Sequence, residues 1–189
     1  RILRLSSGNV VRAVVRQAGS GLLVEVSGSN GRTDTDEAVT LVRTCLRLDE
    51  DFAEFHRACR RFPRFRWISA AGAGRMLRAP GVFEDALKLI CTTNCSWGLT
   101  TIMVRNMVAA FGEPAPAGDR AFPTPEALAG TTEKILRRDI RCGYRSPYIL
   151  EFADVVASGK TDVDSWRTST ASTEELNNEM RKVKGIGPY

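Results

Sequence analysis

The sequence predicts an α+β protein in which a small antiparallel β-sheet with helices precedes an all-helical part. The runs "NVVRAVVRQ" and "GLLVEVSG" are rich in β-branched residues, and the turn sequence "AGSG" joins them, which is typical of a β-hairpin. From Pro80 to the end, apolar residues recur at helical spacing between clear helix caps. We therefore expect an N-terminal α/β domain over residues 1–79 and a helical domain over residues 80–189.

Two helices are expected to follow the hairpin in the N-terminal part. The segment "TDEAVTLVRTCLRL" places Ala38 and Val42 on one helical face, and "DEDFAEFHRACRR" repeats the pattern with Phe52 and Phe55. Pro63 is expected to end the second helix. The next segment, "RFRWISAAGAG", is compatible with a strand or a loop.

The helical part carries its own boundary signals. Gly112 is placed as the C-cap of the helix "WGLTTIMVRNMVAAFG". Thr124 caps a helix that has Pro125 at its first position, and Ser172 with Glu175 forms a capping box. The helix before Gly112 is expected to present one face formed by Leu99, Ile102, Met103, Asn106 and Ala110.

The composition favours an anionic partner and a reducing compartment. The formal net charge is +5, the pI is near 9.2, and 22 arginines stand against 5 lysines. The five cysteines are odd in number and show no disulfide framework. No apolar run approaches the roughly 18 residues of a membrane span, and the first residues, "RILRLSSGNVVRAVV", lack the apolar block and small-residue cleavage site of a secretory signal. We expect no membrane partner, with a location in the cytoplasm (nucleoid) of a bacterium or in the nucleus of a eukaryote.

Basic charge is concentrated in one stretch of the chain. Between Phe55 and Phe83 there is no Asp or Glu. The arginines in this stretch are Arg57, Arg60, Arg61, Arg64, Arg66, Arg75 and Arg78. A solvated protein face and a strip that faces phosphates are both compatible with this pattern.

The sequence ends on "KVKGIGPY", which is typical of a tight turn between two helices. Gly185 and Gly187 would let the backbone turn, Ile186 would pack under the turn, and Pro188 suits the first position of a following helix. Backbone N–H groups at such a helix N-terminus form an anion site suited to a DNA phosphate.

Four segments occur in order over about 110 residues: "GVFEDALKLICTTNCSW", "FPTPEALA", "RCGYRSPYI" and "VKGIGPY". This set resembles the helix-hairpin-helix (HhH-GPD) superfamily of DNA glycosylases, which includes the 8-oxoguanine and 3-methyladenine DNA glycosylases. The resemblance implies a base-excision-repair enzyme that flips a damaged purine out of duplex DNA and excises it. It also implies a monomer whose partner is double-stranded DNA containing a damaged base.

The resemblance assigns three residues to the space that an extruded nucleotide leaves. Asn94 matches the residue that enters the gap and contacts the orphaned base. Tyr144 and Arg145 match residues that wedge beside that base and hydrogen-bond it. The alternatives are purely structural roles: a helix-end cap for Asn94 and core packing for Tyr144.

The same resemblance assigns the terminal turn to the DNA backbone. The expected contacts there are Lys182, Lys184, Gly185, Ile186 and Gly187. No cofactor is required, but the resemblance implies a structural Na+ or K+ in the hairpin. Its ligands would be the backbone carbonyls of Arg181, Val183 and Ile186.

No residue of this chain matches the family's catalytic aspartate, which is expected beyond Tyr189. The 189 residues alone are therefore expected to be inactive, with a loosely packed last helix. Bifunctional members carry a lysine where Tyr189 stands, which favours a monofunctional enzyme without lyase activity. A bifunctional 8-oxoguanine-type glycosylase/lyase and a non-catalytic, structure-specific DNA-binding module remain the alternatives.

Overall fold

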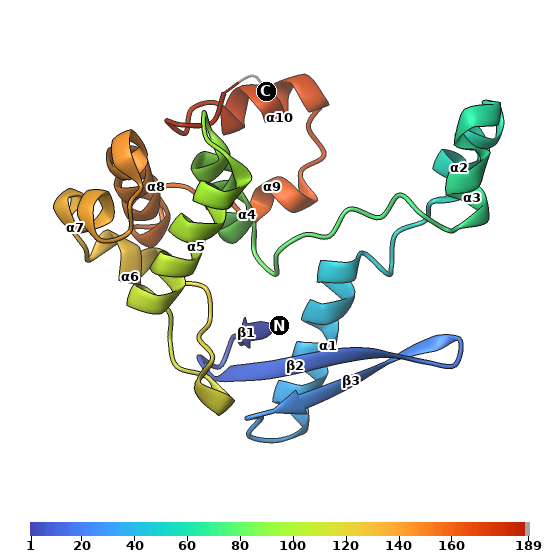
Figure 1. Ribbon diagram of the computed structural model, residues 1–189, viewed down its shortest axis with the longest axis horizontal. Helices are drawn as coiled ribbons and strands as arrows, with labels where there is room; N and C mark the ends of the chain where they lie inside the picture. Colours follow the sequence, from blue (N-terminus) through green and yellow to red (C-terminus); the bar gives the residue numbers. More distant parts are fainter. Residues whose placement is uncertain (188–189) are drawn as a thin grey trace.

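The computed structural model describes residues 1–187, and its α+β architecture confirms the predicted fold class (Figure 1). Strands β1 (Ile2–Arg4), β2 (Val10–Ala18) and β3 (Gly21–Ser27) form one antiparallel sheet in the order β1-β2-β3. The sequence pattern predicted the hairpin of β2 and β3 but missed β1, which is too short to show a period of two.

Helix α1 (Arg32–Leu46) packs against this sheet and forms a small core with it. Val11 and Ala13 point to the same face of β2 because side chains alternate along a strand, and both are fully buried. They pack with Leu3 of β1 and with Ala38 and Val42 of the helix, as the helical spacing predicted for the last two.

In the described part of the main body, seven α-helices follow the sheet and α1. They are α4 (Val82–Thr92), α5 (Trp97–Phe111), α6 (Pro125–Ala129), α7 (Glu133–Arg138), α8 (Ser146–Ala157), α9 (Ser165–Thr168) and α10 (Thr173–Met180). Helix α8 packs against α4, α6 and α7. Within residues 1–187, no helix has the length and apolar character needed to cross a membrane.

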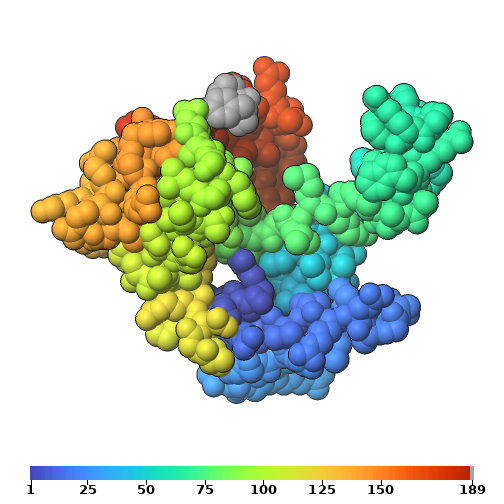
Figure 2. Space-filling model, viewed as in Figure 1, coloured from blue at the N-terminus to red at the C-terminus, as the bar shows by residue number. Residues whose placement is uncertain are grey.

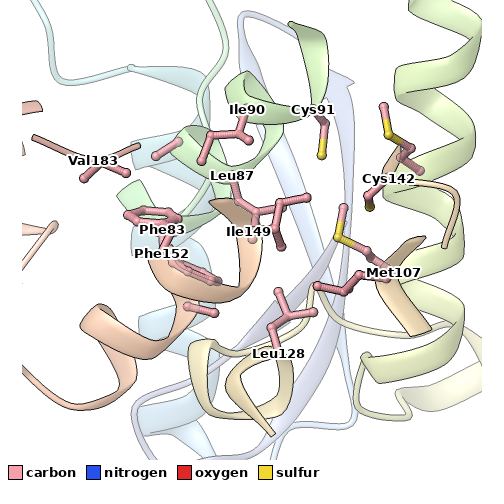
Figure 3. Close-up of a cluster of buried hydrophobic side chains, with 14 of the residues drawn as sticks. Phe83, Leu87, Ile90, Cys91, Met107, Leu128, Cys142, Ile149, Phe152 and Val183 are labelled. Carbon is pink, nitrogen blue, oxygen red and sulfur yellow. The ribbon is translucent and has the colours of Figure 1, made fainter. Parts of the chain in front are cut away.

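The helices share a second core, drawn in Figure 3. Phe83 of α4 stacks on Phe152 of α8 with ring centroids 5.2 Å apart, and Ile149 lies fully buried among them. The predicted face of α5 was wrong in part. Met103 and Met107 are fully buried, whereas Asn106 is only half-buried, so the buried face is rotated from the predicted one.

Residues 52–78 form a separate projection that we call the arm (Figures 1 and 2). It contains α2 (Ala53–Arg60), a 3-10 turn (Pro63–Phe65) and α3 (Arg66–Ala70). The segment expected to be a strand or a loop is therefore partly helical. Cys59 is the one arm residue that is buried.

The predicted helix boundaries in the main body are confirmed. The Thr124 hydroxyl accepts the N–H of Ala127 at 3.2 Å, and Ser172 forms its capping box with Glu175. Helix α5 ends at Gly112, where the later segment that contains Ala121 passes close to the backbone. A Cβ atom at this position would lie 2.2 Å from the carbonyl oxygen of Ala121.

Asp34 joins the sheet to the start of α1 and should make stability depend on pH. Hydrogen bonds from the backbone N–H of Asn30 and the side chain of Asn9 hold the pKa of the Asp34 carboxyl below its ordinary value. A depressed pKa in the folded state means stability that is present near neutral pH and is lost as the pH falls through about 4 and below.

Asp34→Asn should therefore lower the free energy of unfolding at pH 7 and reduce its acid-induced loss. Urea unfolding at pH 7 and pH 3.5 measures both effects. Asp36→Asn, an exposed carboxylate on the same helix, is the matched control. Equal behaviour of the two variants would contradict this role for Asp34.

Candidate functional site

The site begins where α4 ends. Thr93 is the C-cap of this helix, and Asn94 follows it in the left-handed backbone conformation with φ of 45°. Asparagine adopts this conformation more readily than most residues. Asn94 thus terminates the helix, as the alternative of a helix-end cap predicted. Its side chain is nevertheless exposed.

A 3-10 turn, Gly143–Arg145, lies against this helix end. The Arg145 side chain is buried, and its Nε donates to the hydroxyl of Thr93 at 3.1 Å. Its Nη2 donates to the Thr93 carbonyl oxygen. The guanidinium also lies 4.5 Å from the ring centroid of Tyr144. Arg145 therefore ties together two segments that are about fifty residues apart in the chain.

Tyr144 stands beside Asn94 and is 46% exposed, so the core-packing alternative for Tyr144 is wrong. Its hydroxyl donates to the Thr93 carbonyl oxygen at 3.3 Å and accepts from Asn94 Nδ2 at 3.3 Å. The Thr93 hydroxyl lies 3.1 Å away. The side-chain hydrogen bond with the Thr93 hydroxyl, followed by the one from Asn94 Nδ2, lowers the pKa of Tyr144 from its ordinary value.

The terminal turn packs on α4 and α8. Val183 is buried in the helical core, where Figure 3 shows it near Phe83, and the N–H of Ile186 donates to its carbonyl oxygen at 3.1 Å. The last helix, α10, has no buried residue, which agrees with the loose packing expected for it, whereas the turn that follows it is anchored by Val183. Pro188 and Tyr189 lie outside the described residues, and so do the predictions made for them.

These three segments line one open cavity of about 350 Å³. Its lining residues are Thr93, Asn94, Tyr144, Tyr148, Lys184, Gly185, Ile186 and Gly187. The structure thus brings Asn94 and Tyr144 together with four of the five residues predicted in the terminal turn. An exposed aromatic ring, a primary amide and a glycine turn face a common space.

Two of the residues predicted to contact DNA lie outside this cavity. Arg145 is behind it and already bonded to Thr93, so its predicted contact with a base stays a prediction. Lys182 is exposed on α10's side of the turn, where it pairs with Glu179. Lys184 is in the cavity wall and pairs with Glu151 at 2.9 Å, so its ammonium is partly neutralised.

Two lining residues were not predicted. Tyr148 follows Tyr144 by one helical turn, and the two rings meet edge to face with centroids 6.5 Å apart. The four-residue spacing of these two tyrosines in the sequence could have predicted that they lie on the same side of the helix. No sequence pattern pointed to Thr93, because its role depends on its carbonyl group and on a partner far away in sequence.

Two aspartates and two cysteines outside the cavity have structural roles. Asp164 accepts the N–H of Val82 at the start of α4 at 2.9 Å, and Asp162 accepts backbone N–H groups at the start of α9. Burial raises the pKa of Cys91 and of Cys142 to about 12, which keeps both thiols protonated and inert. Among residues 1–187, no cluster of three or more His, Cys, Asp or Glu residues forms a metal site.

No family model matches this chain. An N-glycosylase/DNA lyase of Saccharomyces cerevisiae is 24% identical over 141 residues, which cover 65% of this chain and 38% of that protein. The chain therefore spans well under half the length of this curated relative.

Solved structures show the same fold. The 3-methyladenine DNA glycosylase of Archaeoglobus fulgidus matches 99% of this chain and 63% of its own with a TM-score of 0.78 at 22% identity. The 8-oxoguanine glycosylase/lyase of Clostridium acetobutylicum, solved with double-stranded DNA, matches 100% of this chain and 65% of its own with a TM-score of 0.75 at 22% identity. At this identity the likeness establishes the fold.

The terminal turn should depend on glycine at position 185. Gly185 has φ of +95°, and a Cβ atom there would lie 3.3 Å from Ile90 Cγ2 and from Tyr148 Cβ. Gly185→Ala should lower the free energy of unfolding by about 1–2 kcal/mol from the backbone alone, with a further loss from these contacts.

Gly159→Ala is the matched control, because Gly159 has φ of +71° with nothing within 4 Å of a Cβ atom. Urea unfolding of both variants measures the difference. If Gly159→Ala costs as much as Gly185→Ala, the close packing of the terminal turn is refuted.

Proposed function

We propose that this chain is the nucleotide-flipping part of a base-excision-repair DNA glycosylase of the helix-hairpin-helix type. The observation that carries the proposal is the cavity in which Asn94, Tyr144 and the turn at 184–187 meet. The fold shared with DNA glycosylases supports the same assignment.

The terminal turn is proposed to bind a DNA phosphate. A tight glycine turn can point free backbone N–H groups outward, and such groups bind anions without reading base sequence. Because the N–H of Ile186 already donates to Val183, the N–H groups of Gly185 and Gly187 are the proposed donors. Val183, buried below the turn, anchors it to the helical core. Lys184 adds positive charge once a phosphate competes with Glu151 for its ammonium.

Asn94 and Tyr144 are proposed to occupy the gap left by the extruded nucleotide. Extrusion costs a few kcal/mol of lost stacking and pairing. An aromatic ring stacked on a base recovers about 1–3 kcal/mol, and an amide offers hydrogen bonds to the unpaired base. The exposed ring of Tyr144 and the exposed amide of Asn94 supply both in one place.

A monovalent cation, Na+ or K+, is part of this proposal. The carbonyls of Arg181, Val183 and Ile186 would hold it beside the phosphate. The Val183 carbonyl accepts the N–H of Ile186 at 3.1 Å, which uses one lone pair and leaves the other for a cation. The ion would add positive charge at the phosphate site without a side chain.

The binding step is testable with a duplex that contains an abasic-site analogue, which mimics the vacated position. Asn94→Ala and Tyr144→Ala should each weaken binding about 5- to 100-fold, because each removes a group that fills the gap. Thr92→Ala, which is exposed and outside the cavity, should not. Fluorescence anisotropy measures the affinities, and unchanged binding in both cavity variants would refute this role.

Excision is tested with the full-length protein, because no residue of this chain matches the family's catalytic aspartate. Release of a damaged purine from oxidised, alkylated or deaminated duplexes is the expected result. DNA binding without release of any base would instead identify a non-catalytic binding module.

The finer proposal is a monofunctional enzyme, because Tyr189 stands at the position of the lyase lysine. The complete protein should then form no covalent complex with damaged DNA when borohydride is added, since no Schiff base is present to be reduced. If a covalent complex does form, and Lys184→Ala abolishes it, the lysine in the cavity wall is the nucleophile. That result would contradict the monofunctional assignment.

A further inference from the structure

The arm, residues 52–78, carries most of the basic stretch, and two of its arginines have a structural role. Arg75 donates to the carbonyl oxygens of Arg47 and Glu50. Arg78 donates to the Thr44 carbonyl oxygen at 3.0 Å and pairs with Glu50 at 3.2 Å. These hydrogen bonds fasten the base of the arm to the end of α1.

The other arginines lie further out and have no acidic partner within residues 1–187. They are Arg57, Arg60, Arg61, Arg64 and Arg66, all exposed. Across the described part of the chain, none of the five forms an ion pair. Arg57 and Arg61 are one helical turn apart, on the face opposite the buried Cys59. This separation from carboxylates leaves a concentrated positive surface.

Aromatic rings are interleaved with these arginines. Phe62 is 55% exposed and Trp67 is 62% exposed. Phe62 meets Phe65 edge to face with centroids 6.1 Å apart, and the Arg64 guanidinium lies 4.5 Å from the Phe65 ring centroid. Exposed aromatic rings among arginines are typical of surfaces that bind nucleic acid, because rings contact bases and sugars while guanidinium groups contact phosphates.

We infer that the arm is a second DNA-binding surface, which contacts the duplex away from the nucleotide-flipping cavity. The choice of DNA as the partner rests on the proposed function, and the choice of this surface rests on its charge and its aromatic rings. Figure 2 shows the arm standing clear of the main body in that view, so DNA has open access to it. Its contribution is electrostatic, independent of damage, and sensitive to salt.

The test compares two triple variants of equal charge on an undamaged duplex. Arg57→Ser/Arg61→Ser/Arg64→Ser removes three arm arginines. The control removes three exposed arginines elsewhere: Arg16→Ser/Arg32→Ser/Arg137→Ser. The arm triple should reduce the slope of log K against log salt by about 0.9 for each phosphate that an arginine no longer neutralises, so by up to about 2.7.

The control triple should change this slope much less. Circular dichroism establishes that both variants are folded. Equal slopes in the two triples would overturn the inference. The arm triple should keep the native preference for the abasic-site duplex over the undamaged duplex, because that preference depends on the cavity, so failure of the arm and failure of the cavity are separate results.

Trp67→Ala tests the aromatic component and should weaken duplex binding about fivefold or more. An anionic lipid surface is the competing partner for basic residues mixed with aromatic rings. Vesicles of phosphatidylcholine with phosphatidylglycerol are the second probe. If the arm triple abolishes vesicle binding and leaves DNA binding intact, the arm is a membrane-binding surface and the inference fails.

Discussion

The hydrogen bonds from Arg145 to Thr93 hold the candidate site together. They fix the end of α4 against the 143–145 turn, which places Asn94 beside Tyr144. A hydrogen bond that involves a charged group contributes about 1.5–3 kcal/mol, and removal of a buried partner leaves the other group unsatisfied. The buried Arg145 therefore positions the exposed residues Asn94 and Tyr144.

The terminal turn depends on the same helices in a different way. Val183 belongs to the hydrophobic core that α4 and α8 share, and Gly185 lies close to Ile90 and Tyr148. Because protein cores are close-packed, the turn and the α4 end keep a fixed spacing. A phosphate bound at the turn and a base beside Tyr144 would thus be held in a defined geometry. The arm differs, because it has almost no buried residue and can contribute charge without such precision.

Local signals in the sequence were sufficient for much of the fold. The β2–β3 hairpin, the Thr124 cap and the Ser172 capping box each depend on residues within a few positions, and each was predicted correctly. The ordered motifs also identified Asn94 and Tyr144, which the structure brings to one cavity. The short strand β1, helix α3 of the arm and the exact buried face of α5 were missed, because tertiary packing decides them. The partnership of Thr93 with Arg145 spans 52 positions, and no local pattern predicts it.

Asn94 and Tyr144 are proposed to replace a nucleotide that leaves the duplex. The most direct measurement is the fluorescence of 2-aminopurine placed at the target position of a duplex. Binding of the complete protein should raise this fluorescence, because the base leaves the stack, and the Asn94→Ala/Tyr144→Ala variant should lose most of the rise at saturating protein. An equal rise in the double variant, or no rise with the native protein fully bound, would contradict the claim.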